Sequence, residues 1–227
     1  MLFLAVFCGF LAEYQLEHTI EHQREKKFIS SLYEDVTLDT TALSQIYELR
    51  NSRESMLDSL TKLLNSPDRD LHLNQIYFFA RHIQRLFPMN FTYNDGTIQQ
   101  LKNSGNLRLI KNTDAADSIT VYDNEAIKTI LVQQETEEEL RENIAWEIIA
   151  KVLDGVVWDN MNDSNSKISR PVVNPSLVTR DPTLINEFHF KVVQLKATLL
   201  FTNRYITKAI ASAQSLIELL KKEYHLK

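Results

Sequence analysis

The clearest pattern of apolar and polar positions in this chain is a heptad repeat near its C-terminus. Apolar or small residues recur there at alternating spacings of three and four residues. This spacing keeps one stripe of a helix facing a partner helix, as in coiled coils. We therefore expect one long helix, packed within the chain or against a second copy. Its seam comprises Ile185, Phe188, Val192, Leu195, Leu199, Thr202, Ile206, Ala209, Ala213, Leu216 and Leu220.

Helical spacing of apolar residues also fills most of the preceding chain. Two interruptions in these stripes are charged. Arg50 and Arg53 fall in the middle of the stripe of one predicted helix, and the acidic run 135–139 predicts a solvated face or a joint in another. The predicted helices cover residues 28–36, 41–65, 68–87, 97–101 and 114–161.

Several short segments predict breaks between these helices. Residues 37–39 predict a break, after which either Asp39 or Thr40 caps the next helix. Gly105 stands where a left-handed residue ends the short helix, and residues 107–110 alternate like an extended linker. Residues 159–182 carry Asn, Ser, Asp and three prolines, which predicts one long loop.

An unbroken apolar run opens the chain at Met1 and ends at Ala12, before a charged stretch without Gly or Pro. A helix that spans a membrane needs about 20 apolar residues, so this run is short. We expect a membrane anchor that is shortened at its start. A buried helix and a signal or lipoprotein segment around Cys8 stay open as alternatives. Phe10 disfavours a signal peptide, because a cleavage site needs a small residue there.

Composition narrows the classes of protein. The 227 residues include only 4 Gly and 5 Pro, too few for the turns of a β-rich fold. The net charge is −5 without a basic block, which disfavours nucleic acid as a partner. We expect an all-α fold, in which an N-terminal membrane helix continues into an elongated helical bundle with the heptad-patterned helix at its end. Residues 1–12 would be the anchor and residues 13–227 the helical domain.

One short motif carries possible chemistry. The residues His18-Thr19-Ile20-Glu21-His22 match H-x-x-E-H, in which two imidazoles on one helix face bind zinc and the glutamate is a general base. A third protein ligand is not apparent, and the motif lies on a charged helix. No phosphate-binding glycine loop or nucleophile motif accompanies it. We therefore expect no catalytic, cofactor-binding or metal site, with His18, Glu21 and His22 as the only metal candidates.

Two stretches together resemble a family of uncharacterised bacterial proteins. One is the apolar run with its charged continuation to Asp35. The other runs from Thr97 to Asn112 and contains Leu101-Lys102-Asn103-Ser104-Gly105-Asn106-Leu107-Arg108-Leu109-Ile110, an L-K-x-S-G-N-L-x-L-I pattern. The resemblance covers the N-terminal half of the chain. It implies one N-terminal transmembrane helix before a mostly helical domain, and it implies no activity or ligand. Basic residues ahead of the anchor in relatives would imply a periplasmic domain.

These observations predict a single-pass protein of the bacterial inner membrane with its helical domain in the periplasm. We expect a non-enzymatic helical scaffold or partner-binding protein without cofactors. Its partners would be the lipid bilayer, through residues 1–12, and either another protein or a second copy of the chain. An extracytoplasmic sensor or ligand-binding domain is the alternative. A zinc hydrolase built on the H-x-x-E-H motif is a more remote one.

Overall fold

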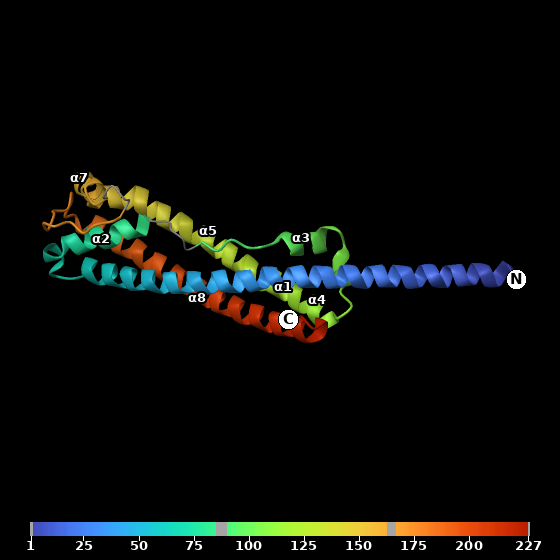
Figure 1. Ribbon diagram of the computed structural model, residues 1–227. Coiled ribbons are helices and arrows are strands. Elements are labelled where there is room, and N and C mark those ends of the chain that lie inside the picture. Colours follow the sequence, from blue (N-terminus) through green and yellow to red (C-terminus); the bar gives the residue numbers. More distant parts are fainter. Residues whose placement is uncertain (1, 85–89, 163–166, 227) are drawn as a thin grey trace. The chain divides into compact units, whose positions relative to one another are not determined.

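The computed structural model describes residues 2–84, 90–162 and 167–226, and its regular structure is helical (Figure 1). The described residues contain no strand, only two isolated bridges between single residues. The predicted all-α class is therefore confirmed. The elements are α1 (Leu2–Leu64), η1 (Arg69–Leu71), α2 (Leu73–Gln84), α3 (Gly96–Asn103), η2 (Asn106–Leu109), α4 (Thr113–Val121), η3 (Tyr122–Ile127), α5 (Lys128–Asn143), η4 (Ile144–Ile149), α6 (Ala150–Val152), α7 (Gly155–Asp159) and α8 (Pro182–Tyr224).

Helix α1 runs without interruption through residues 37–39, so the predicted break there is wrong. The hydroxyl groups of Thr37 and Thr40 donate to the carbonyl oxygens of Tyr33 and Val36, each four residues earlier, at 2.7 Å. These hydroxyls thus bond within the helix instead of capping a new one. Asp39 does not cap a helix either, because its side chain is fully buried inside the fold.

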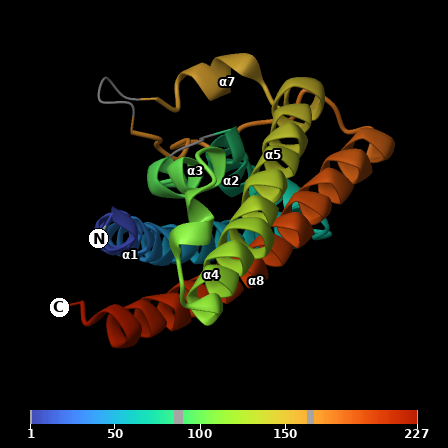
Figure 2. The same ribbon diagram turned by 90° about the vertical axis from the view of Figure 1, so that its right-hand side faces the viewer.

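The chain divides into two compact units, and α1 and α8 each contribute to both. Unit 1 comprises Met1–Leu43, Thr92–Lys128 and Lys208–Lys227, and unit 2 comprises Ser44–Phe91 and Thr129–Thr207. In unit 1, α4 and the C-terminal end of α8 lie beside the part of α1 that follows its projecting N-terminal segment, and Tyr224 at the end of α8 bonds to Glu25 of α1 (Figures 1 and 2). Its buried apolar side chains include Ile29, Leu32, Val36, Ile98, Leu101, Ile119, Tyr122, Ala213 and Leu216.

Unit 2 has one hydrophobic core, to which α1, α2, η4 and α8 each supply a buried stripe. The side chains of Leu60, Tyr77, Ile148 and Phe188 represent these four elements. The Tyr77 hydroxyl also donates to the carbonyl oxygen of Ser176 at 2.8 Å and accepts from the N–H of Asp154 at 2.6 Å. This tyrosine therefore holds part of the long connection between α7 and α8 against the core.

Every residue of the predicted heptad seam is buried in α8. The part from Ile185 to Ile206 lies in unit 2, and the part from Ala209 to Leu220 lies in unit 1. The helix begins at Pro182 and ends at Tyr224, a little beyond each end of the seam. The sequence pattern thus identified both the helix and the side of it that is covered.

Two π-helical segments, η3 and η4, lie within the region 114–161 that the sequence predicts as helical, with or without a joint at the acidic run. Each wide turn brings neighbouring residues inward together: Tyr122 with Asp123 in η3, and Ile144 with Ala145 in η4. π-Helical turns are uncommon and frequently accompany functional or specialised positions. The predicted linker at residues 107–110 is instead mostly the short 3₁₀ helix η2, whereas Gly105 has the expected left-handed φ of 65°.

In the described residues, no helix combines the length and the apolar content needed to cross a bilayer. The predicted location as a single-pass inner-membrane protein is therefore wrong. Helix α1 is long, but its apolar run ends at Glu13, and Glu17 and Glu21 follow at one-turn intervals. The run is thus well short of the roughly 20 residues that a spanning segment requires.

Candidate functional site

The N-terminal part of α1 projects beyond the other elements of unit 1 (Figure 1). Every residue from 6 to 20 is exposed, and we call this segment the arm. Its exposed side chains are unusually apolar for a solvated helix. Phe10, Tyr14 and Leu16 are 68%, 63% and 62% exposed. Large apolar side chains gathered on one exposed segment are typical of interaction sites in folded proteins.

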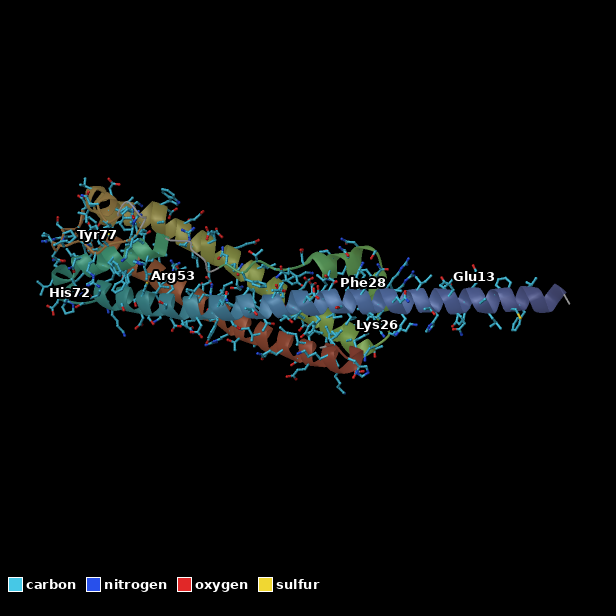
Figure 3. All side chains as sticks on the ribbon, in the orientation of Figure 1. Glu13, Lys26, Phe28, Arg53, His72 and Tyr77 are labelled. Carbon is cyan, nitrogen blue, oxygen red and sulfur yellow. The ribbon has the colours of Figure 1, made fainter. Side chains whose placement is uncertain are left out.

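The apolar side chains of the arm do not form a single stripe. Phe7, Phe10 and Tyr14 follow one another at helical spacing, whereas Leu16 and Ile20 lie on another face, because successive residues rotate by about 100° around a helix. Three carboxylates, those of Glu13, Glu17 and Glu21, recur at every fourth position and form an acidic edge. Figure 3 labels Glu13 on the projecting part of α1. The arm therefore offers apolar surface on several sides, with negative charge along one of them.

The H-x-x-E-H residues lie at the base of the arm, and each imidazole has a different neighbour. His18 Nε2 lies 2.9 Å from the Nζ of Lys111, and His22 Nδ1 lies 3.3 Å from Oε2 of Glu25. A lysine ammonium group at a histidine nitrogen opposes a metal cation at the same atom, by charge and by occupation of the lone pair. Among the described residues, no group of three His, Cys, Asp or Glu side chains is arranged to hold a metal ion.

Glu25 forms the first of three buried polar centres, and only 3% of it is exposed. Its Oε1 accepts from the Tyr224 hydroxyl at 2.7 Å and from the N–H of Lys111 at 2.8 Å. Burial alone would raise the pKa of Glu25, but the hydrogen bonds from Tyr224, Lys111 and His22 together hold the pKa below its ordinary value. Glu25 thus joins the end of α8 and the segment before α4 to α1.

Asp39 forms the second centre, deep in unit 1. Its Oδ1 accepts from the backbone N–H of Asn94 at 3.1 Å and from the side-chain amide at 2.7 Å, while its Oδ2 accepts from the Tyr122 hydroxyl at 3.1 Å. Burial raises the pKa of Asp39 despite these three hydrogen bonds, and the nearby charge of Asp35 adds to the rise. The carboxyl group fastens the loop before α3 and the π-helix η3 to the middle of α1.

A second aspartate lies beside this centre on η3. Asp123 is 1% exposed, accepts from the Tyr93 hydroxyl at 3.1 Å and pairs with the ammonium group of Lys102. Burial and the neighbouring carboxylates raise the pKa values of both Tyr93 and Tyr122, so both phenols stay protonated as donors. The wide turn of η3 explains this arrangement, because it brings Tyr122 and Asp123 inward together.

The third centre surrounds Arg50 in unit 2. The guanidinium group is fully buried and donates to Glu137 Oε1 at 2.5 Å, to Asn203 Oδ1 at 2.6 Å and to the carbonyl oxygen of Leu199 at 3.3 Å. Glu137 belongs to the acidic run that the sequence predicts as solvated, yet its side chain is only 11% exposed. A buried arginine therefore explains both the interruption in the α1 stripe and part of the acidic run in α5.

Two further arginines, Arg53 and Arg141, lie near Arg50 in the same centre. Burial, together with the positive charges of Arg141 and Arg50, lowers the pKa of Arg53 to about 10. Arg53 donates to the carbonyl oxygen of His82, and Arg141 pairs with Glu138. The cavity among these groups measures about 20 Å³, room for about one water molecule. This centre is thus a filled structural network rather than a pocket for a metabolite.

The three centres share one property that bears on chemistry. Each central charged group, Glu25, Asp39 or Arg50, has its hydrogen-bonding partners within the chain. The sequence patterns predicted other roles for Asp39, as a helix cap, and for Glu137, within a solvated face or a joint, and they singled out no role for Glu25, because the partners of these carboxylates lie far along the chain. Only Arg50 and Arg53 left a local signal, the charged interruption of an apolar stripe. The arm, whose residues are all exposed, is therefore the better candidate for a binding site.

Compared with models of protein families, with curated proteins and with solved structures, the chain has no match.

Proposed function

We propose that this protein is a non-enzymatic helical scaffold that holds a protein partner on the arm of α1. The observation that carries the proposal is that every residue from 6 to 20 is exposed, among them Phe7, Phe10 and Tyr14, whose side chains are 51%, 68% and 63% exposed. Behind the arm, we propose that α8 packs along its heptad seam in a helical bundle, for which the burial of every seam residue is the support. The buried polar centres stiffen that bundle.

The shape and charge of the arm define the partner that we propose. Because the apolar side chains lie on several faces, one flat surface or a single helix would leave part of them in water. A groove lined with apolar side chains covers such a helix on several sides, which is a common mode of helix recognition. Glu13, Glu17 and Glu21 favour a groove with a basic rim, since complementary charges steer and orient association.

Site-specific photo-cross-linking in cells tests this proposal. We expect a photoreactive amino acid in place of Phe10 to cross-link the full-length protein to a distinct second protein. Trp146 is the matched control position, because it is also apolar and 73% exposed but lies in unit 2. Cross-links from position 10 to that protein, absent from position 146, support the proposal. The identified protein must also show an apolar groove with basic residues at its edge.

Three outcomes of the same experiment contradict the proposal. Equal cross-linking from both positions would show that the arm has no special role. Cross-links only between copies of this chain would make the arm a self-association element. If the purified protein co-floats with lipid vesicles and no second protein is cross-linked, the apolar residues of the arm bind lipid and not a protein partner.

A further inference from the structure

Unit 1 contains a cavity of about 360 Å³ between α1 and α3, apart from the apolar end of the arm. Arg24 and Lys27 of α1 supply positive charge to its lining, and Thr97, Gln100 and Asn106 supply neutral polar groups. Phe28 provides an apolar surface against which the body of a ligand can pack. The cavity volume lies at the lower end of the range typical of small-molecule sites.

The charges of this cavity are not balanced by its own lining, which contains no acidic side chain. Arg24 and Lys27 are three residues apart on a helix, a spacing that places both on one face. Within the part of the chain that the structure describes, neither side chain forms an ion pair with a carboxylate. Two cations on the α1 wall of a cavity whose lining holds no carboxylate favour an anionic ligand.

We infer that this cavity binds a small molecule carrying one phosphate monoester group. A phosphate accepts several charge-assisted hydrogen bonds at once, and an arginine guanidinium group matches its geometry. The Thr97 hydroxyl in the same lining can donate a further hydrogen bond to the phosphate.

An adjoining hollow of about 390 Å³ restricts what the ligand can be. It shares Arg24 and Asn106 with the cavity, but its other lining includes Glu13, Glu17 and Glu21. A second anionic group extending into that hollow would meet three carboxylates and be repelled. The arrangement therefore selects a compact monophosphate, such as a sugar phosphate, over a molecule with phosphates at both ends.

Calorimetric titration of the full-length protein tests this inference with defined probes at fixed ionic strength. The probes are inorganic phosphate, ribose 5-phosphate and ribose. We expect saturable binding of ribose 5-phosphate, weaker binding of inorganic phosphate and no binding of ribose, because ribose lacks the anionic group. Binding of ribose as tight as that of ribose 5-phosphate, or a response to phosphate that does not saturate, would overturn the inference.

Matched glutamine variants locate the site. Arg24→Gln and Lys27→Gln each remove one cation from the cavity, and we expect each to weaken ribose 5-phosphate binding about tenfold or more. Lys26→Gln is the control, since Lys26 is the exposed neighbour of Lys27 and does not line the cavity (Figure 3). Because all three positions are exposed, we expect unchanged circular dichroism spectra. Equal effects of Lys26→Gln and Lys27→Gln would show nonspecific attraction and contradict the site.

Discussion

Replacing Arg50 by methionine is expected to lower the free energy of unfolding by about 3–5 kcal/mol, the range for breaking a buried ion pair from one side. The variant leaves the Glu137 carboxylate largely buried, and Asn203 and the Leu199 carbonyl lose their donor. Arg53 partly compensates, because it lies close enough to Glu137 for their charges to interact. Urea unfolding followed by circular dichroism measures the loss.

Two further variants separate the ion pair from simple packing. The double variant Arg50→Met with Glu137→Leu replaces both charges by apolar groups, and we expect it to be more stable than Arg50→Met alone. Lys62→Ala is the surface control, since its ion pair with Asp58 involves a lysine side chain that is 75% exposed. We expect Lys62→Ala to lower the free energy of unfolding by less than about 1 kcal/mol. A double variant no more stable than the single one would contradict the role given to Glu137.

Replacing Asp39 by alanine is expected to destabilise the protein by about 1–3 kcal/mol, the cost of leaving a buried polar group without its partner. The Tyr122 hydroxyl loses its acceptor inside unit 1, and the Asn94 amide groups lose theirs at the edge of the loop. Glu34→Ala on the exposed side of α1 is the matched control. Thermal unfolding that shifts equally in both variants would show that the Asp39 contacts add no stability.

Asp39→Asn isolates the ionisation of the same group. Because burial raises the folded-state pKa of Asp39, the charged form is less favoured in the folded protein than in the unfolded chain. Lowering the pH through the folded-state pKa toward the unfolded value therefore adds stability to the wild type. Asparagine cannot ionise, so the variant lacks this contribution. We therefore compare the free energies of unfolding of the two proteins at two pH values. The stability of Asp39→Asn relative to the wild type is expected to be higher at pH 7 than at pH values just below the unfolded pKa. The opposite trend would contradict a raised pKa.

The sequence pattern predicted those features that depend on local spacing. The seam of α8 is visible because burial repeats along one helix face, and Gly105 is visible because its left-handed conformation favours glycine. Residues 37–39 misled the prediction, since threonine and aspartate are typical of caps when their tertiary contacts are unknown. The predicted inner-membrane location was wrong because it rested on the apolar run alone. That run favoured an anchor, but no described helix is long and apolar enough to cross a membrane.

The contacts within the buried polar centres could not be predicted from local sequence patterns. The partners Asn94 and Tyr122 lie 55 and 83 positions from Asp39, and Glu137 lies 87 positions from Arg50. No periodicity connects residues at such separations, and the π-turn that brings Tyr122 and Asp123 inward has no simple sequence signature. The charged interruption at Arg50 and Arg53 was the one local sign that a buried network existed.

The most direct test is a calorimetric titration of the full-length protein with its purified partner, the protein that photo-cross-linking identifies. It measures whether the arm contributes to the affinity for that partner. We expect Phe10→Ala to weaken binding about tenfold or more, as is typical for a central aromatic residue of an interface. Trp146→Ala, which also removes an exposed aromatic side chain, is expected to leave the affinity unchanged. A Phe10→Ala variant that binds the partner as tightly as the wild type would contradict the scaffold function proposed for the arm.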